Sequence, residues 1–169
     1  MKRILPVFLT LLVLLCACGR KSSDVPDGYQ LASSEFVDYD LFVPTEWKLD
    51  ESGGAVSAYK SASDPASVSV MTWGLPHADD TAADWWQTYR GEFDKLFEEF
   101  TLVSEDNVLL GGEKAVKYVY TAKLNGFEYR YAQIACVRNT SVYLMTFTED
   151  AATDHAEEFN GIAELFRWR

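Results

Sequence analysis

Few residues of this chain combine the types and the spacing that hydrolytic chemistry needs. Such chemistry requires a nucleophile, a base and a group that orients the base. The chain has two histidines: His77 lies in a loop beside Asp79 and Asp80, and His155 falls in the first turn of an expected C-terminal helix. Neither has a cysteine or a second histidine at metal-ligand spacing, so we expect both imidazoles to be exposed. The sequence therefore predicts no catalytic site and no metal site.

Four tyrosines and one glutamine form a candidate binding surface. Tyr118 and Tyr120 alternate along one expected strand, and Tyr129, Tyr131 and Gln133 alternate along the next. Four hydroxyls and an amide are unusual in a dry core, because each buried polar group needs a partner. The patch is therefore either a partly open surface for a ligand or partner, or a layer packed beneath a helix with hydroxyls at its rim. The residue types favour packing beneath a helix.

The N-terminus has the order of an export signal. Lys2 and Arg3 precede an apolar run, Ile4–Ala17, which is shorter than the about 20 apolar residues of a membrane-spanning helix. A positive segment, an apolar segment and a small residue at the exit are typical of a signal peptide that is cleaved.

The apolar run ends in the motif Leu15-Cys16-Ala17-Cys18, which resembles the lipobox of bacterial lipoproteins. In a lipobox, a small residue precedes a cysteine that is lipidated and becomes the first residue of the mature protein. Cys18 follows the small Ala17, whereas Cys16 follows the larger Leu15, so Cys18 is the expected lipid-attachment site. The resemblance implies that residues 1–17 are a lipoprotein signal peptide and that 18–28 are the lipidated N-terminus and a polar linker. Several acyl chains on one cysteine give stable anchoring, so we expect a location on the extracytoplasmic face of the cell membrane.

Charge and cysteine content limit the partners and the source of stability. The chain has 15 basic and 26 acidic residues and a formal charge of −11, which becomes −13 without Lys2 and Arg3. So acidic a domain repels phosphate backbones, so we expect no nucleic-acid partner. Cys136 is the one cysteine left after the signal and the lipid site, and a lone thiol forms no internal disulfide. Stability must come from the core of one domain of about 140 residues.

The clearest local structure is a β-hairpin. Asn125-Gly126 supplies the two residues of a type I′ turn between strands Lys114–Leu124 and Phe127–Val137, which places Leu124 opposite Phe127. A further turn at Asn139-Thr140 adds Val142–Thr148 as a third strand. Both faces of this sheet are apolar, so both must be covered.

The remaining elements follow from residue periodicity. Short strands are expected at Glu35–Val43, Ala55–Tyr59 and Ser67–Trp73. Aromatic residues at helical spacing predict one long helix, Thr81–Phe100, and a last helix near Thr153–Trp168 is expected to cover the other face.

The order of these elements resembles a known family. The segment FVDYDLFVPTEW, Phe36–Trp47, is a strand that ends in proline and is followed by a tryptophan; two short strands, an aromatic helix, a three-stranded meander and a last helix come after it. This order resembles the Mog1/PsbP-like domain. The resemblance implies an α+β fold for residues 29–169, an antiparallel sheet of about six strands between helices. An alternative is a cystatin-like sheet with helices on one side, against which the two apolar hairpin faces argue.

Together these observations predict a function class without naming a partner. We expect an extracytoplasmic, membrane-anchored lipoprotein that binds or helps assemble a protein partner in the envelope, without catalysis and without a cofactor. Two rival hypotheses remain: an envelope hydrolase using His77 and nearby carboxylates, and a lipoprotein that binds a small ligand at the tyrosines.

Overall fold

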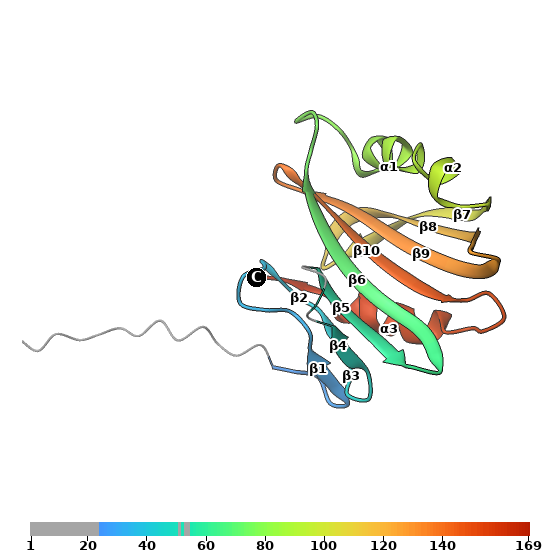
Figure 1. Cartoon of the computed structure of the whole chain (residues 1–169). Coiled ribbons are helices and arrows are strands. Elements are labelled where there is room, and N and C mark those ends of the chain that lie inside the picture. The colour runs from blue at the N-terminus through green and yellow to red at the C-terminus, as the bar shows by residue number, and fades with distance from the viewer. Residues whose placement is uncertain (1–23, 51, 53–54) are drawn as a thin grey trace, which may run out of the picture.

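A seven-stranded antiparallel sheet dominates the structure (Figure 1). The structure is a computed structural model, and it describes residues 24–50, 52 and 55–169. The strand order is β4-β5-β6-β10-β9-β8-β7, so β6 lies beside the last strand of the meander. The strands are β4 Lys48–Asp50, β5 Val56–Ser61, β6 Asp64–Gly74, β7 Glu99–Leu110, β8 Glu113–Leu124, β9 Phe127–Arg138 and β10 Ser141–Asp150.

The meander has the predicted register. Leu124 lies opposite Phe127, and the same pairing continues to Ala115 opposite Cys136. Asn125 and Gly126 have φ values of 53° and 82°, as a type I′ turn requires. The strand expected at Val142–Thr148 lies within β10, which pairs with β9 on one side and β6 on the other.

The N-terminal strand expected at Glu35–Val43 does not form as one element. Instead β1 (Tyr29–Leu31) pairs with β3 (Phe42–Pro44), and β2 (Tyr39–Asp40) pairs with β11 (Arg167–Trp168), outside the main sheet. The split has a local cause: the Leu41 N–H donates to Ser33 Oγ at 2.9 Å, and the Ala32 N–H donates to the Leu41 carbonyl at 2.8 Å. The backbone around Leu41 is thus paired within the N-terminal segment.

The prediction of a single long helix at Thr81–Phe100 is also wrong. The chain forms α1 (Ala82–Arg90), one turn of α2 (Phe93–Leu96) and then β7. Gly91, which ends α1, costs about 1 kcal/mol relative to alanine inside a helix. The predicted start of α1 is confirmed. Thr81 Oγ1 accepts from the Asp84 N–H at 3.2 Å, and Asp84 Oδ2 accepts from the Thr81 N–H at 3.0 Å.

Phe97 and Phe100 continue the helical spacing but lie on extended chain. The Glu98 N–H donates to the Lys123 carbonyl, and Glu99 begins β7 opposite Lys123. Phe100 still packs 5.0 Å from Tyr120, measured between ring centroids, so the aromatic side chains reach the same core from a strand. β4 and β7 had no counterparts among the expected strands, and the segment expected at Glu35–Val43 lies outside the main sheet, so the sheet has seven strands instead of about six.

Both faces of the sheet are covered, as the apolar hairpin predicted. α1 and α2 lie over one face, and α3 (Ala156–Leu165) with the N-terminal segment lies over the other (Figure 1). α3 is shorter than the helix expected at Thr153–Trp168, since Trp168 belongs to β11. The core under α3 includes Tyr39, Leu41, Trp47, Phe147, Phe159 and Ile162, and the core under α1 includes Trp85, Trp86, Phe93, Tyr118, Tyr120 and Leu144.

The α+β class therefore holds, with a dominant sheet and few helices. Within residues 24–50, 52 and 55–169, none of the helices has the length and apolar character needed to cross a membrane.

Candidate functional site

The tyrosine patch lies beneath α1. Trp86 of α1 stacks on Tyr118 with 3.6 Å between ring centroids, and its Nε1 donates to Gln133 Oε1 at 2.9 Å. The amide nitrogen of Gln133 in turn donates to Thr146 Oγ1 at 3.2 Å. Tyr118, Tyr120 and Gln133 are all buried, so none of the three is presented on a surface.

Tyr129 and Tyr131 lie at the rim of this layer. Both are half-buried, and Tyr131 stacks on Tyr120 with 5.0 Å between ring centroids. The candidate surface predicted from the sequence thus divides into three buried residues and two accessible ones. Packing beneath a helix accounts for the first three, with hydroxyls reaching the rim only at Tyr129 and Tyr131.

The hydroxyl of Tyr118 is a buried polar group without a hydrogen-bond partner among the described residues. Burial, with a smaller contribution from the charge of Glu105, raises the pKa of Tyr118 to about 12. The phenol therefore stays neutral at physiological pH. Its stacking on Trp86 is a packing contact rather than a reactive site.

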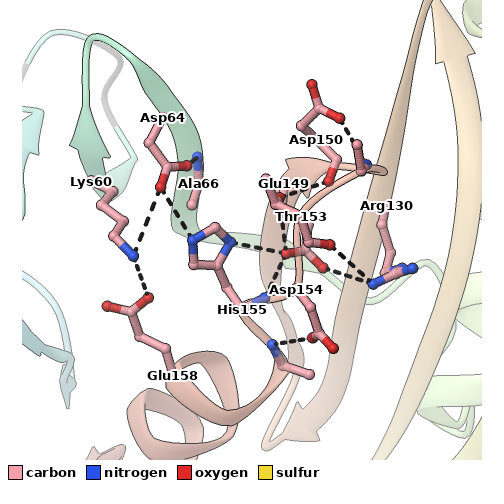
Figure 2. A network of polar contacts seen from close by, with 12 residues as sticks. Lys60, Asp64, Ala66, Arg130, Glu149, Asp150, Thr153, Asp154, His155 and Glu158 are labelled. Atoms are coloured by element: carbon pink, nitrogen blue, oxygen red, sulfur yellow. Dashed lines mark hydrogen bonds and ion pairs between the residues drawn. The ribbon is translucent and has the colours of Figure 1, made fainter.

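His155 is the centre of a polar network that the sequence did not indicate (Figure 2). Its Nδ1 lies 3.0 Å from Glu149 Oε2, and its Nε2 lies 3.2 Å from Asp64 Oδ2. The backbone N–H of His155 also donates to Glu149 Oε2, at 2.7 Å. Only 12% of the His155 side chain is exposed, so the expectation of a surface histidine was wrong for this residue. His155 is the N-cap residue of α3. The carboxylates of Asp64 in β6 and Glu149 in β10 contact its ring there.

Further charged groups complete the network. Arg130 Nη1 lies 3.4 Å from Glu149 Oε1, and Lys60 Nζ lies 3.1 Å from Glu158 Oε2 and 3.8 Å from Asp64 Oδ2. Three carboxylates thus face Lys60, Arg130 and His155. Both ring nitrogens of His155 can donate to these carboxylates only when the imidazole is protonated.

This arrangement is suited to holding elements together. Each ring nitrogen of His155 faces a carboxylate of the fold, and 12% of the side chain is exposed, so neither nitrogen is presented to a nucleophile as a general base must be. The contacts join β5, β6, β9 and β10 to the start of α3 (Figure 2).

A sequence signal for part of this network existed. Extending the meander register by one pair beyond Thr148 places Glu149 directly opposite Arg130, as the structure has it. Nothing in the sequence pointed to Asp64 or His155 as their neighbours.

The other histidine lies where it was expected. His77 is exposed in the loop before α1, which confirms the prediction for this residue. Its backbone N–H donates to Asp80 Oδ2 at 3.1 Å, and the Asp80 N–H donates to the His77 carbonyl at 3.1 Å. Asp79 is exposed beside them. The Asp80 carboxylate therefore holds a turn rather than orienting the imidazole.

The structure describes Cys136 but not Cys18. Cys136 is buried in the core, and burial raises the pKa of its thiol to about 11. Cys18, the expected lipid-attachment site, lies outside the described residues, as do Cys16 and the whole signal peptide. Within the described part of the chain, no group of three or more His, Cys, Asp and Glu residues could hold a metal ion.

A groove of about 680 Å³ lies between the N-terminal segment and strands β4, β5 and β6. Three exposed apolar residues line it: Phe36, which is 89% exposed, Leu49 and Met71. The described lining includes one carboxylate, Asp50, and no basic residue. The groove therefore suits apolar groups and disfavours anions.

Comparison with known proteins identifies the fold. No protein-family model and no curated protein sequence matches this chain. Among solved structures, cyanobacterial PsbP (CyanoP) of Synechocystis has a TM-score of 0.61 at 13% identity, covering 90% of this chain and 99% of that chain.

Two further structures are similar. LpqN of Mycobacterium tuberculosis, described as involved in cell envelope biogenesis, has a TM-score of 0.55 at 23% identity over 76% of this chain and 82% of its own. A protein of Bacteroides thetaiotaomicron has a TM-score of 0.52 at 15% identity over 78% of this chain and 45% of its own. Identities this low show the fold alone. The expected Mog1/PsbP-like fold is thus supported.

Proposed function

We propose that this chain is a membrane-anchored, extracytoplasmic lipoprotein whose PsbP-like domain binds a protein partner in the cell envelope and performs no catalysis of its own. The lipid is carried on Cys18. The linker Gly19–Gly28 extends at most about 35 Å, so the domain stays close to the membrane.

The single observation that carries the non-catalytic part is the pairing of His155. Both of its nitrogens face carboxylates of the fold, at 3.0 Å and 3.2 Å, and the side chain is 12% exposed, so the imidazole is not placed beside a nucleophile or an open substrate site. The remaining histidine, His77, is exposed, and its neighbour Asp80 bonds to the backbone of the loop. Neither histidine is arranged as a base that activates a nucleophile.

Two observations support the envelope location. The lipobox-like motif at Leu15-Cys16-Ala17-Cys18 directs lipid attachment, and LpqN, which has the same fold, is described as involved in cell envelope biogenesis. The acidic domain is repelled by anionic lipid headgroups, so it extends from the membrane rather than lying on it.

Anchoring is tested by lipid labelling. Cys18→Ala should abolish metabolic labelling with palmitate and release the protein from the membrane fraction, whereas Cys16→Ala should leave both unchanged. Label that persists in Cys18→Ala and disappears in Cys16→Ala would move the attachment site. Absence of label from the wild-type chain would remove the lipoprotein assignment.

The binding role is tested by crosslinking in the native membrane. The wild-type chain should give a discrete crosslinked partner, identified by mass spectrometry, that the released Cys18→Ala protein no longer gives. An intact anchor without any specific crosslinked species would contradict a partner-binding function.

The rival hydrolase hypothesis has a separate test. A triple variant His77→Ala, Asp79→Asn and Asp80→Asn should keep the wild-type cell phenotype if the domain only binds. Loss of the phenotype in a variant that unfolds at the wild-type denaturant concentration would favour catalysis in this loop.

The groove lined by Phe36, Leu49 and Met71 favours a second candidate function, capture of a small uncharged apolar ligand. Such ligands should raise the melting temperature of the wild-type protein. Met71→Lys should abolish that shift, and Leu96→Lys, at an exposed apolar residue away from the groove, should not. An equal loss in both variants would exclude the groove.

A further inference from the structure

Strand β7 ends the main sheet and exposes the longest free edge in the described part of the chain. It pairs with β8 at eleven positions, from Glu99 opposite Lys123 to Leu110 opposite Glu113, and no other described strand lies on its outer side. The opposite edge, β4, has three residues. An unpaired edge presents a row of N–H and C=O groups that can template another strand.

Both faces of this edge are open between Glu105 and Asn107. Successive side chains of a strand point to opposite faces, and all three residues in this stretch are exposed. No helix therefore covers the edge here. The register shift between Leu102 and Ser104 interrupts the ladder just before this stretch, so Ser104–Leu110 is its uninterrupted part. At its end the buried Leu110 carbonyl accepts from Trp168 Nε1 at 3.0 Å, so the free backbone groups lie within Ser104–Leu109.

The side chains along the edge suit a particular partner. Val103 is 62% exposed and Leu109 is 66% exposed, which places an apolar residue near each end of the stretch. Glu105 and Asp106 lie between these two apolar residues, and neither forms an ion pair with another described residue. Lys117, opposite Asp106 on β8, donates instead to Asn160 Oδ1 at 2.8 Å. The edge thus carries two adjacent acidic residues, Glu105 and Asp106, with an exposed apolar residue on either side of them, Val103 and Leu109.

A second copy of the chain fits this edge poorly. An antiparallel pair of β7 strands with its two-fold axis between Glu105 and Asp106 would place Glu105 of one copy opposite Asp106 of the other. Like charges directly opposite on neighbouring strands are destabilising, and the chain as a whole is acidic. The charges favour a partner that brings basic side chains.

We propose that Ser104–Leu109 of β7 binds an extended, basic segment of a partner protein, which adds to the sheet as an eighth strand. Main-chain hydrogen bonds to the edge supply the common part of the affinity, as in other strand-addition complexes. Glu105 and Asp106 select lysine or arginine side chains, and Val103 and Leu109 contact apolar ones. The inference rests on the proposed binding function and gives it a site and a partner chemistry.

The first test uses the full-length chain in a neutral detergent and a labelled nine-residue peptide of alternating lysine and valine, capped at both ends. The peptide should bind, measured by fluorescence anisotropy, and the double variant Glu105→Lys, Asp106→Lys should weaken it by at least about tenfold. The matched control Glu157→Lys, Glu164→Lys makes the same charge change on exposed residues of α3. Equal weakening in both variants would show attraction to net charge only and would overturn the site.

The second test separates strand addition from charge. A peptide with the same lysines but an N-methyl group on every residue has no N–H group on either edge, so it cannot form the antiparallel ladder and should not bind. The unmethylated peptide should slow amide hydrogen exchange in Ser104–Leu109 and leave α3 unchanged. Equal binding of the methylated peptide, or unchanged exchange along β7, would overturn strand addition.

The outcomes distinguish this inference from the proposed function. A photo-crosslinker at position 107 should capture the envelope partner in the native membrane through a basic segment, whereas one at position 87, exposed on α1, should not. A partner captured from position 87 alone would overturn the β7 site and leave the binding function intact. Loss of anchoring in the palmitate experiment would leave the peptide results unaffected.

Discussion

The indole of Trp86 lies flat on the ring of Tyr118, with 3.6 Å between the ring centroids and 5° between the ring planes. The same indole donates its N–H to Gln133, which is 3% exposed. One side chain of α1 therefore fills the core above the meander and satisfies a buried amide. This contact makes the tyrosine layer part of the core rather than an open binding surface.

Removing the indole should destabilise the protein strongly. Trp86→Ala removes a fully buried side chain and the donor to Gln133, so we expect the free energy of unfolding to fall by about 3–5 kcal/mol, measured by urea denaturation. Gln87→Ala, at an exposed neighbour in the same helix, should change it by less than about 0.5 kcal/mol. A loss in Trp86→Ala no larger than that in Gln87→Ala would mean that the buried indole and its hydrogen bond contribute no stability.

Tyr118→Phe should be neutral or stabilising near pH 7. The hydroxyl is buried without a partner among the described residues, and burying an unsatisfied polar group costs about 1–3 kcal/mol. The phenylalanine ring keeps the stacking on Trp86. Urea denaturation at pH 7 checks this, and a clear loss of stability would reveal a hydrogen bond to this hydroxyl.

Stability should decline at alkaline pH. Burial raises the pKa of Cys136 from 9.0 to about 11, and it raises the pKa values of Tyr118 and Tyr143 from 10.0 to about 12. The folded state therefore holds these protons more tightly than the unfolded state does, so stability is fully present below the unfolded pKa values and is lost as pH rises through the folded ones. The free energy of unfolding should fall from about pH 9 upward. Tyr118→Phe should reduce the slope between about pH 10 and 12, and an identical slope would contradict this assignment.

The network around His155 should depend on Glu149. This carboxylate is 1% exposed and contacts both His155 and Arg130, so Glu149→Gln leaves two basic groups with a weaker partner. We expect the free energy of unfolding, measured by urea denaturation, to fall by about 3 kcal/mol. This is the lower end of the range for a buried ion pair, because Arg130 is partly exposed. Glu128→Gln, at an exposed position on β9, is the matched control and should have little effect. A Glu149→Gln protein as stable as the control would mean that the network adds no stability.

The thiol of Cys136 should be inert in the folded protein. It is fully buried, and its pKa of about 11 leaves almost no thiolate at pH 8. Iodoacetamide should modify the peptide that contains Cys136 in urea but not in native buffer, as read by mass spectrometry. Rapid modification of the native protein would indicate that the core over this strand opens.

Local features of the sequence were enough to predict the meander. Asn125-Gly126 defines a two-residue turn, and a turn of known length sets every pair of the hairpin, so Leu124 lies opposite Phe127 as predicted. The capping box of Thr81 and Asp84 is equally local. The apolar residues on both faces of the hairpin predicted that helices would cover the sheet twice, and they do.

The end of α1 and the existence of β7 could not be predicted in this way. Spacing of three and four residues from Trp85 to Phe100 fits one continuous helix. However, Glu99–Leu110 gains a partner strand in β8, which a local pattern does not reveal. Pairing with β8 supplies backbone hydrogen bonds to a strand whose first two residues, Glu99 and Phe100, belonged to the expected helix.

The sequence alone therefore determined the elements whose signals lie within a few residues: the apolar run with its lipobox-like motif, the type I′ turn and the cap of α1. Tertiary structure decided the environment of the side chains that could do chemistry. His155 was expected at the surface, but the structure brings Asp64 and Glu149 to it from β6 and β10. The tyrosines were expected beneath a helix, but only the structure identifies Trp86 as the side chain that covers Tyr118. The reason is physical: burial and ion pairing depend on which distant segments pack together, and no local pattern of residue types records that.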